Sequence, residues 1–241
     1  MRLHIVNPNS SAGMTEQIRR VAARVAAPGT TLDVTCGAAA PVSIEGYTDE
    51  ALAVPAMLAE IRAAELRGAD AHVVACFDDP GIDAAREVAK GPVIGICEAA
   101  IRTALMLSSR FSVITTLPRS IPIIEDLADA YGAGRKCRRV RAIDLPVLAL
   151  ESNLSNTARL LAAEVAVARR EDQAEAIVLG CAGMADLCEQ LTAETGVLVI
   201  DGVTAAVKFA EAVVGTGYRT SKLGAYAAPL EKTGGFTREV A

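Results

Sequence analysis

The sequence predicts an α/β protein with mainly parallel β-sheets, because short apolar runs alternate with longer helix-patterned stretches along its 241 residues. Hydrophobic residues make up 51% of the chain and aromatic residues only 3%, so aliphatic side chains and alanine must fill the core. This composition is typical of helices packed on strands that are buried on both faces. A strand–helix pattern that recurs in the two halves of the chain further predicts two lobes.

The strands are predicted where aliphatic and β-branched residues form short uninterrupted runs. These runs are residues 3–7, 32–35, 71–76, 93–96, 111–115, 140–144, 176–179 and 197–200. The stretches between and after them have helical periodicity and are residues 12–27, 48–67, 80–90, 98–108, 119–131, 154–170, 183–194 and 203–214. Ser10 or Ser11 is expected to cap the first helix, and Asp79 followed by Pro80 is expected to cap the third.

An internal repeat places a cysteine after a buried strand in each half of the chain. Residues 69–76 read ADAHVVAC and residues 174–181 read AEAIVLGC. A helix of similar length follows each cysteine, then a glycine (Gly91 or Gly196) and another strand. Cys76 and Cys181 therefore occupy equivalent positions at the carboxyl ends of central strands, where open parallel sheets bind ligands.

The repeat predicts two lobes related by a pseudo-twofold axis, with the active site in the cleft between them. We expect residues 1–97 plus 203–241 to form the first lobe, which carries Cys76. Residues 98–202 are expected to form the second lobe, which carries Cys181.

Two opposed cysteines suggest a two-base racemisation, in which one thiolate removes a proton from carbon and the opposite thiol returns one. Backbone N–H groups at the helix start after each cysteine favour the thiolate, so we expect the pKa of each thiol to move down toward neutral pH. The alternative is that both cysteines are small buried hydrophobic residues. We adopt that interpretation for the other four, which are Cys36, Cys97, Cys137 and Cys188.

Polar residues at two equivalent strand ends are candidate substrate ligands. Asn7 and Asn9 follow the first strand, and Thr115 and Thr116 end the fifth, so all four can donate hydrogen bonds to substrate carbonyls. A capped turn would also explain the asparagines, and strand propensity would explain the threonines. Asp78 and Asp79 are interpreted as caps.

Several classes of function are excluded by composition. The net charge of -5, with both signs well mixed, gives no basic face for nucleic acid. No run reaches the roughly 18 apolar residues of a membrane span, and no signal-peptide pattern is present, so a cytoplasmic protein is expected. With two histidines and no CxxC motif, we expect neither a metal site nor a Cys–His nucleophile pair.

Seven strings spread over nearly the whole chain resemble the hydantoin racemase branch of the aspartate/glutamate/hydantoin racemase family. They are VNPNS (6–10), SIEG (43–46), DEA (49–51), ACFDDPGIDAAR (75–86), GPVIGI (91–96), FSVITT (111–116) and GCAGM (180–184). The resemblance implies two flavodoxin-like lobes, no cofactor, a homo-oligomer and a catalytic pair at Cys76 and Cys181. It also implies a substrate ring held by Asn7, Asn9, Ser43, Phe77, Thr115, Thr116 and Gly183.

The residues after the two cysteines favour a neutral cyclic ureide as substrate. The amino-acid racemases of the family tend to have Asn and Thr there, whereas this chain has Phe77 and Ala182. No strand-end motif contains a lysine or arginine that would pair with a carboxylate. The leading hypothesis is therefore racemisation of 5-substituted hydantoins, with an oxyanion developing on the ring carbonyl.

Three alternatives remain open at the level of sequence. The first is racemisation of allantoin, which is itself a hydantoin. The second is a Cys-dependent isomerase or decarboxylase of the same superfamily, such as maleate isomerase or arylmalonate decarboxylase. The third is a non-catalytic two-lobed binding protein. The preferred C5 substituent and enantiomer, the cysteine that serves each enantiomer, the oligomer size and the extent of lobe closure are left open as well.

Overall fold

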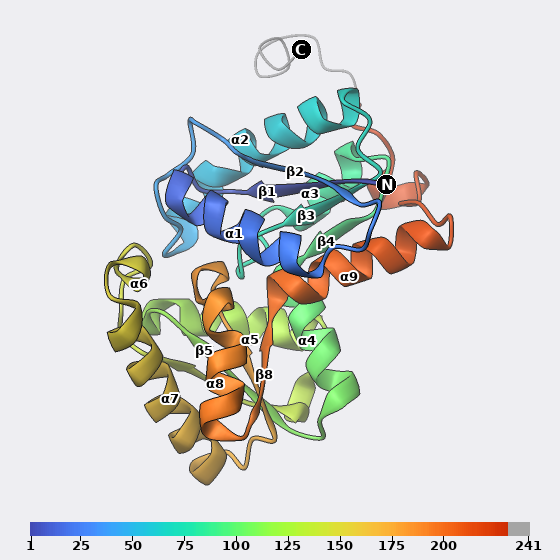
Figure 1. The fold of residues 1–241 in the computed structure, drawn as a ribbon. Helices are drawn as coiled ribbons and strands as arrows, with labels where there is room; N and C mark the ends of the chain where they lie inside the picture. Colours follow the sequence, from blue (N-terminus) through green and yellow to red (C-terminus); the bar gives the residue numbers. More distant parts are fainter. Residues whose placement is uncertain (231–241) are drawn as a thin grey trace.

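The computed structural model describes residues 1–230, apart from the side chain of residue 151, and has two lobes (Figure 1). Each lobe is built on a four-stranded sheet, and the strands within each sheet are parallel. The predicted α/β class with two lobes is confirmed.

The first sheet has the strand order β2-β1-β3-β4. Its strands are β1 (Arg2–Asn7), β2 (Thr31–Cys36), β3 (Ala71–Val74) and β4 (Val93–Gly95). The second sheet repeats this order as β6-β5-β7-β8. Its strands are β5 (Phe111–Thr115), β6 (Cys137–Ala142), β7 (Ala176–Leu179) and β8 (Leu198–Asp201).

The helices follow the predicted stretches closely, with two differences. They are α1 (Ala12–Val25), α2 (Tyr47–Leu66), α3 (Ile82–Val88), α4 (Ile96–Leu107), α5 (Ile121–Ala130), α6 (Ala149–Ser152), α7 (Leu154–Glu171), α8 (Cys188–Thr195) and α9 (Gly202–Gly215). The short α6 was not predicted, and the stretch predicted over 183–194 divides into the 3-10 helix η3 (Ala182–Leu187) and α8. Within residues 1–230, no helix is long and apolar enough to cross a membrane.

The two predicted caps have different outcomes. Ser11 caps α1 as expected, since its hydroxyl accepts the N–H of Met14 at 3.2 Å. The cap predicted at Asp79 is wrong for α3, which begins at Ile82 with Gly81 in the cap position. Asp79 instead accepts N–H groups at the start of α4, a tertiary contact that local sequence does not reveal.

Helices α4 and α9 cross between the lobes. Helix α4 follows β4 of the first sheet but packs against β7, β8 and α5, whereas α9 follows β8 of the second sheet but packs against α1, β3 and β4. The two helices also pack against each other at the junction (Figure 1). A side chain at Gly202 would overlap the carbonyl of Ile96, so glycine is required there. Because these are the first residues of equivalent helices, their contact marks the pseudo-twofold axis.

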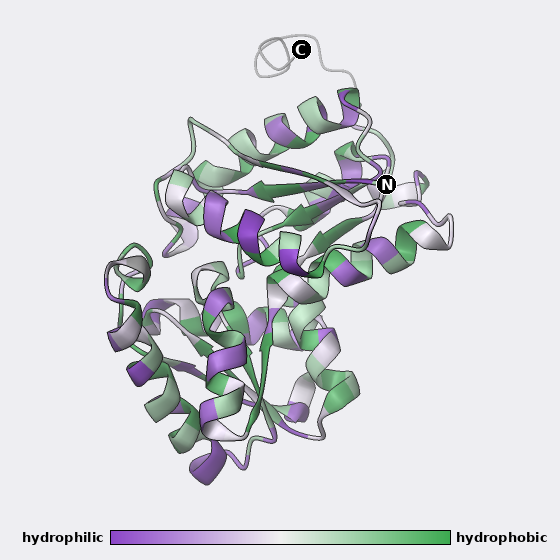
Figure 2. Ribbon diagram, viewed as in Figure 1, coloured by the Kyte–Doolittle hydropathy of each residue, from purple (hydrophilic) through white to green (hydrophobic). Residues whose placement is uncertain are grey.

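The hydrophobic core continues across this junction. The central strands β3 and β7 are buried along their whole length. One apolar cluster joins Ile5 and Val73 of the first sheet to Val113 and Val178 of the second. Figure 2 shows mostly hydrophobic colours on the central strands and hydrophilic turns on α1. The two lobes therefore share a core as well as a pair of helices.

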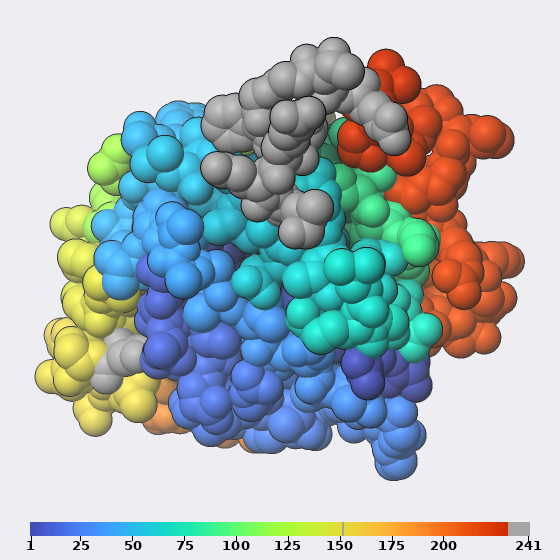
Figure 3. Space-filling view, turned by 90° about the horizontal axis from the view of Figure 1, so that it is seen from above, coloured from blue at the N-terminus to red at the C-terminus, as the bar shows by residue number. Residues whose placement is uncertain are grey.

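The segment after α9 returns to the first lobe, where the red C-terminal residues lie beside the teal ones in Figure 3. Lys222 Nζ donates to the carbonyls of Arg86 (2.6 Å) and Glu87 (3.0 Å), and the Tyr226 hydroxyl donates to Asp83 at 2.8 Å. These contacts support grouping the segment from 203 with the first lobe. The boundaries 1–97, 98–202 and 203–241 stay a prediction, and residues 231–241 lie outside the described part of the chain.

A chain of hydrogen bonds crosses the first sheet through two buried histidines. His4 Nε2 lies 2.9 Å from the Thr35 hydroxyl, His4 Nδ1 lies 3.0 Å from His72 Nδ1, and His72 Nε2 lies 2.9 Å from a Glu65 carboxylate oxygen. Because the carboxylate only accepts, His72 donates to it, accepts from His4, and leaves His4 to accept from Thr35. Burial and the neighbouring His72 lower the pKa of His4 to about 3.

Lowering the pH below 6.5 is expected to destabilise the protein through His4. The folded-state pKa is about 3 and the ordinary value is 6.5, so between these values the unfolded chain binds a proton that the folded chain does not. The free energy of unfolding should fall by about 1.4 kcal/mol per pH unit for this group. The variant His4→Gln lacks this titration. Urea unfolding of both proteins across this pH range measures the difference, and equal slopes would contradict the prediction.

Candidate active site

A single pocket brings together the carboxyl ends of both sheets. It is lined by Asn9, Met14, Ile44, Ala75, Cys76, Phe77, Asp78, Thr115, Thr116, Ser120, Val147, Gly180, Cys181 and Ala182. The cavity measures about 30 Å³, which is room for one or two water molecules. The structure thus places both predicted cysteines in one pocket, to which they come from different sheets.

The two cysteines are held in similar backbone turns. Cys76 lies two residues after the end of β3, and its carbonyl accepts the N–H of Asp79 at 3.1 Å. Cys181 lies two residues after the end of β7 and its carbonyl accepts the N–H of Met184 at 3.1 Å. Each sulfur therefore follows a buried central strand and precedes a turn of the same spacing, as the repeat predicts.

The electrostatic surroundings of Cys76 differ from the expectation. Burial, followed by the negative charge of Asp78, raises the pKa of the Cys76 thiol well above its ordinary value. A backbone hydrogen bond from Asp78 acts in the opposite direction, as the sequence suggested, but it is outweighed. The predicted downward pKa shift is therefore wrong for Cys76, because the sequence reveals neighbouring N–H groups but not desolvation.

Asp78 lines the pocket, although it was expected to cap a helix. Burial, then the charges of Glu50 and Asp79, raise the pKa of Asp78 to about 7. Among the described residues that line the pocket, it is the only Asp, Glu, Lys, Arg or His. The remaining walls are apolar or carry hydroxyl, thiol and amide groups.

Asn9, Thr115 and Thr116 line the pocket, whereas Asn7 lies behind it. The Asn7 amide donates to Asn9 Oδ1 at 2.8 Å and to the Thr15 hydroxyl at 3.0 Å. Asn7 therefore orients Asn9. The Thr115 hydroxyl donates to the carbonyl of Gly180 at 3.1 Å and so fixes the residue that precedes Cys181.

Of the site residues that the family resemblance alone implied, one lines the pocket and two do not. Phe77 lines the pocket, whereas Ser43 and Gly183 are not among its lining residues. Ser43 precedes the lining residue Ile44. A Cβ added at Gly183 would lie 3.7 Å from the sulfur of Cys181, so glycine leaves space beside that thiol.

Lining residues from loops and helices were missed by the sequence argument. Met14 comes from α1, Ile44 from the loop after β2, and Val147 from the loop after β6. Ile44 and Val147 follow equivalent edge strands, so the repeat could have paired them. The sequence identified candidate site residues by their polar or reactive side chains at strand ends. Met14, Ile44 and Val147 are apolar and do not lie at strand ends, so nothing in their local sequence distinguishes them from core residues.

Two hydrogen bonds join the lobes beside the pocket. Gln17 of α1 donates to the carbonyl of Gly183 at 3.0 Å, and a Glu45 carboxylate oxygen accepts the N–H of Val147 at 2.8 Å. The second contact holds the loops that carry Ile44 and Val147 against each other, and the first ties α1 to the residue two positions after Cys181.

The other cysteines lie elsewhere. Cys97 is fully buried in the shared core, and burial raises its pKa well above the ordinary value. Burial also raises the pKa of Cys137 and of Cys188 to about 12. In the part of the chain that the structure describes, no group of three or more His, Cys, Asp or Glu side chains is placed to hold a metal ion.

Comparison with known proteins gives similarity over the whole length. A model of the Asp/Glu/hydantoin racemase family matches residues 3–210. The hydantoin racemase of Rhizobium meliloti is 61% identical over 232 residues, which cover 96% of each chain. Among solved structures, allantoin racemase from Klebsiella pneumoniae has a TM-score of 0.96 at 48% identity, covering 100% of this chain and 98% of that one. Allantoin racemase from Pseudomonas fluorescens has a TM-score of 0.90 at 39% identity, with coverages of 97% and 99%.

Neutralising Asp78 is expected to make Cys76 more reactive. Since the charge of Asp78 raises the pKa of the thiol, Asp78→Asn should lower it. More of the thiol is then ionised, so alkylation at pH near 8 should be about threefold faster. Iodoacetamide labelling followed by mass spectrometry of the Cys76 peptide measures this rate. Asp83→Asn, at a side chain that is 75% exposed, is the matched control and should leave the rate unchanged. An unchanged rate in Asp78→Asn would contradict the prediction.

Proposed function

The chain belongs to the Asp/Glu/hydantoin racemase family and is a racemase, and we propose that its substrates are 5-substituted hydantoins. In the proposed reaction, the thiolate of one cysteine takes the proton from C5 while the thiol of the other delivers its proton to the opposite face. One S–H bond forms and one breaks, so the reaction needs no cofactor. The roles of Cys76 and Cys181 reverse for the other enantiomer.

The observation that carries this proposal is that repeat-equivalent cysteines from two sheets line one pocket. A planar carbanion at C5 must be approached from both faces, and a pseudo-twofold arrangement supplies one thiol on each. The charge of Cys181 contributes to the upward pKa shift of Cys76, so the two sulfurs lie near enough to interact. Only one of the two thiols needs to be ionised at a time, so two negative charges need not lie close together in the pocket.

The raised pKa of Cys76 suits proton abstraction from carbon. A base of higher pKa takes a proton from a weak carbon acid more readily, although less of it is ionised at neutral pH. Negative charge that moves from sulfur to the ring carbonyl needs hydrogen-bond donors. We assign this part to Asn9 and Thr116, and we assign Thr115 to the wall beside the ring. Asn7, Ser43 and Gly183 do not line the pocket, and we assign them to supporting the residues that do.

The walls of the pocket favour an alkyl or aryl group at C5. Met14, Ile44, Phe77, Val147 and Ala182 present apolar surface that has no partner for a polar substituent. Burying an unpaired polar group against such a wall is unfavourable, whereas an alkyl group gains free energy from burial. The 61% identity to a hydantoin racemase supports the same choice.

Allantoin is the second candidate substrate, and two observations favour it. The chain superposes on an allantoin racemase with a TM-score of 0.96. Asp78 also lines the pocket, and its carboxylate could accept N–H groups of a ureido substituent. A homo-oligomeric state and a cytoplasmic location stay predictions for either substrate.

Replacing either cysteine is expected to abolish racemisation but not all proton exchange. Cys76→Ser and Cys181→Ser should each lower racemisation by about 10²- to 10⁴-fold, the usual contribution of an acid or base. The remaining thiolate still reaches one face of C5. Each variant should therefore exchange the C5 proton of one enantiomer in D₂O, and the two variants should select opposite enantiomers. Polarimetry and NMR of enantiopure 5-alkyl hydantoins measure both effects.

Cys137→Ser is the matched control, because Cys137 lies on β6 and outside the pocket, and it should keep full activity. Full racemisation by either active-site variant would exclude the two-cysteine mechanism. A covalent isomerase would depend on one cysteine only, and a binding protein would exchange no C5 proton.

The choice between alkyl hydantoins and allantoin as substrates is tested by comparing the kcat/KM values of the two. We expect kcat/KM for 5-isobutyl hydantoin to exceed that for allantoin by at least about tenfold, since burying a few methylene groups is worth about 1.5–3 kcal/mol. Loss of optical rotation measures both rates. A preference for allantoin would overturn the assignment to alkyl hydantoins and leave the two-cysteine mechanism standing.

A further inference from the structure

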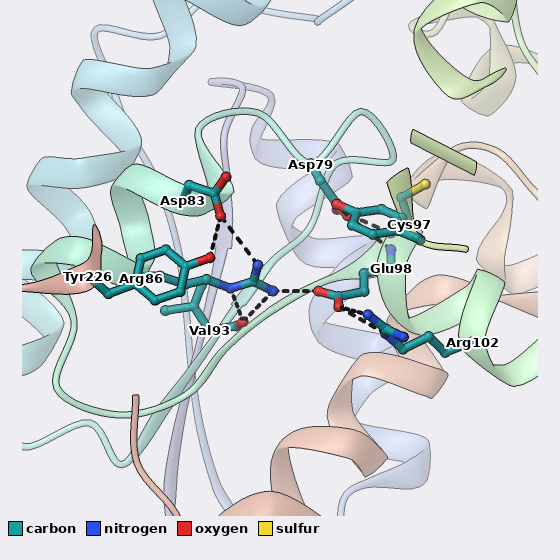
Figure 4. A network of polar contacts seen from close by, with 9 residues as sticks. Asp79, Asp83, Arg86, Val93, Cys97, Glu98, Arg102 and Tyr226 are labelled. Atoms are coloured by element: carbon teal, nitrogen blue, oxygen red, sulfur yellow. Dashed lines mark hydrogen bonds and ion pairs between the residues drawn. The ribbon is translucent and has the colours of Figure 1, made fainter. Parts of the chain in front are cut away.

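Asp79 is a buried acid that the proposed reaction does not use. Its side chain lies between the loop that carries Cys76 and the start of α4 (Figure 4). The carboxylate accepts the backbone N–H of Cys97 at 3.1 Å and that of Glu98 at 2.9 Å, and it also accepts the hydroxyl of Tyr131 at 2.8 Å. Three donors thus converge on one buried side chain.

This carboxylate replaces the N-cap side chain of α4. The N-cap position itself is Gly95, and a Cβ added there would overlap the Asp79 carboxylate. The equivalent helix α9 is capped in the ordinary way, because its own N-cap residue Asp201 accepts the N–H of Thr204 at 2.8 Å. The two halves therefore satisfy the same helix start by different means.

The difference concerns Cys76 directly. Asp79 closes the turn of Cys76 through its own N–H, and its φ of +41° is a left-handed conformation that non-glycine residues seldom adopt. The corresponding residue of the second half is Met184, whose side chain packs in the apolar core. The turn of Cys76 is thus anchored to α4 by a carboxylate, whereas that of Cys181 is anchored by packing.

We propose that Asp79 is a positioning residue for Cys76, which fixes the height and direction of that sulfur by binding the first N–H groups of α4. The inference rests on the proposed two-cysteine reaction. Helix α4 lies at the pseudo-twofold axis and packs on the second lobe. Asp79 therefore ties the loop of Cys76 to α4, the helix that also packs on the second lobe, and so sets the position of Cys76 relative to that lobe.

The effect of Asp79 on the stability of α4 can be distinguished from its effect on Cys76 by moving the capping carboxylate from position 79 to position 95. In the double variant Asp79→Gly with Gly95→Asp, the carboxylate at 79 is gone, so Asp at 95 has space to cap α4 as Asp201 caps α9. Glycine also accepts the left-handed φ at 79. The single variant Asp79→Gly should lower Tm by about 2–4 °C, and the double variant should recover it.

Racemisation should not recover with Tm. We expect kcat/KM of the double variant to stay at least about tenfold below that of the native chain, because a shift of about 1 Å in a catalytic group is that damaging. When the double variant is combined with Cys181→Ser, C5 deuterium exchange of the one enantiomer that Cys76 deprotonates should fall. When it is combined with Cys76→Ser, exchange of the other enantiomer should hold. Recovery of full activity with Tm, or equal loss for both enantiomers, would overturn the proposal.

Two further variants complete this test. Asp79→Asn, which keeps one acceptor oxygen, should show a smaller loss of the same one-sided kind. Tyr131→Phe removes the third donor but neither backbone contact, and it should leave both exchange rates unchanged. A loss as large as that of Asp79→Gly would show that the contact to Tyr131, and not α4, holds the loop, and would overturn the proposal.

Alkylation distinguishes this proposal from the proposed function. The iodoacetamide rate of Cys76 should change more in the double variant than in Asp79→Asn, which also removes the charge of Asp79 near the thiol, while that of Cys181 holds, whatever the substrate. If the native chain racemises neither substrate, the proposed function fails while this labelling still decides the position of Cys76. Equal changes at both cysteines, or none, would overturn the positioning role.

Discussion

The arrangement of the molecule depends on the contact between Gly202 and the carbonyl of Ile96, where the first turns of α9 and α4 cross. Each helix leaves one sheet and packs on the other lobe, so the lobes hold each other by exchanged elements in addition to a shared core. Lobes joined only by loops would be free to move as separate bodies. Here the carboxyl ends of β3 and β7 are brought to one pocket, and with them Cys76 and Cys181.

The backbone obeys the pseudo-twofold symmetry more strictly than the side chains do. Cys181 immediately precedes a 3-10 helix that is anchored by apolar packing, whereas Cys76 lies in a loop with the half-buried Asp78 and the buried Asp79, and burial with Asp78 raises its pKa. A racemase tolerates such asymmetry because its substrate and product are mirror images of equal free energy. The equilibrium constant is fixed at one, so kcat/KM must be equal in the two directions however different the two bases are.

The sequence revealed what depends on local patterns and on the repeat. Strands 111–115 and 176–179 were predicted to the residue, while β6 starts earlier than predicted because its outward arginines hide the apolar signal of an edge strand. Asp79 was correctly seen as a cap but assigned to the following helix, since its true partner α4 is a tertiary neighbour. The pKa of Cys76 was predicted in the wrong direction because desolvation appears only in the folded pocket, as do the lining residues Met14, Ile44 and Val147.

Burial of the Cys76 thiol has two opposite effects that together suit proton transfer at carbon. Desolvation raises its pKa and disfavours the thiolate at neutral pH, but the thiolate that does form is a stronger base toward a weak carbon acid. A thiol also carries a single proton, which it must either pass on or exchange with water. In the proposed reaction one thiolate takes a proton while the opposite thiol gives up its own, so each turnover exchanges the protonation states of the two cysteines. The enzyme must then act on the opposite enantiomer, or exchange protons with solvent, before it can repeat the same reaction.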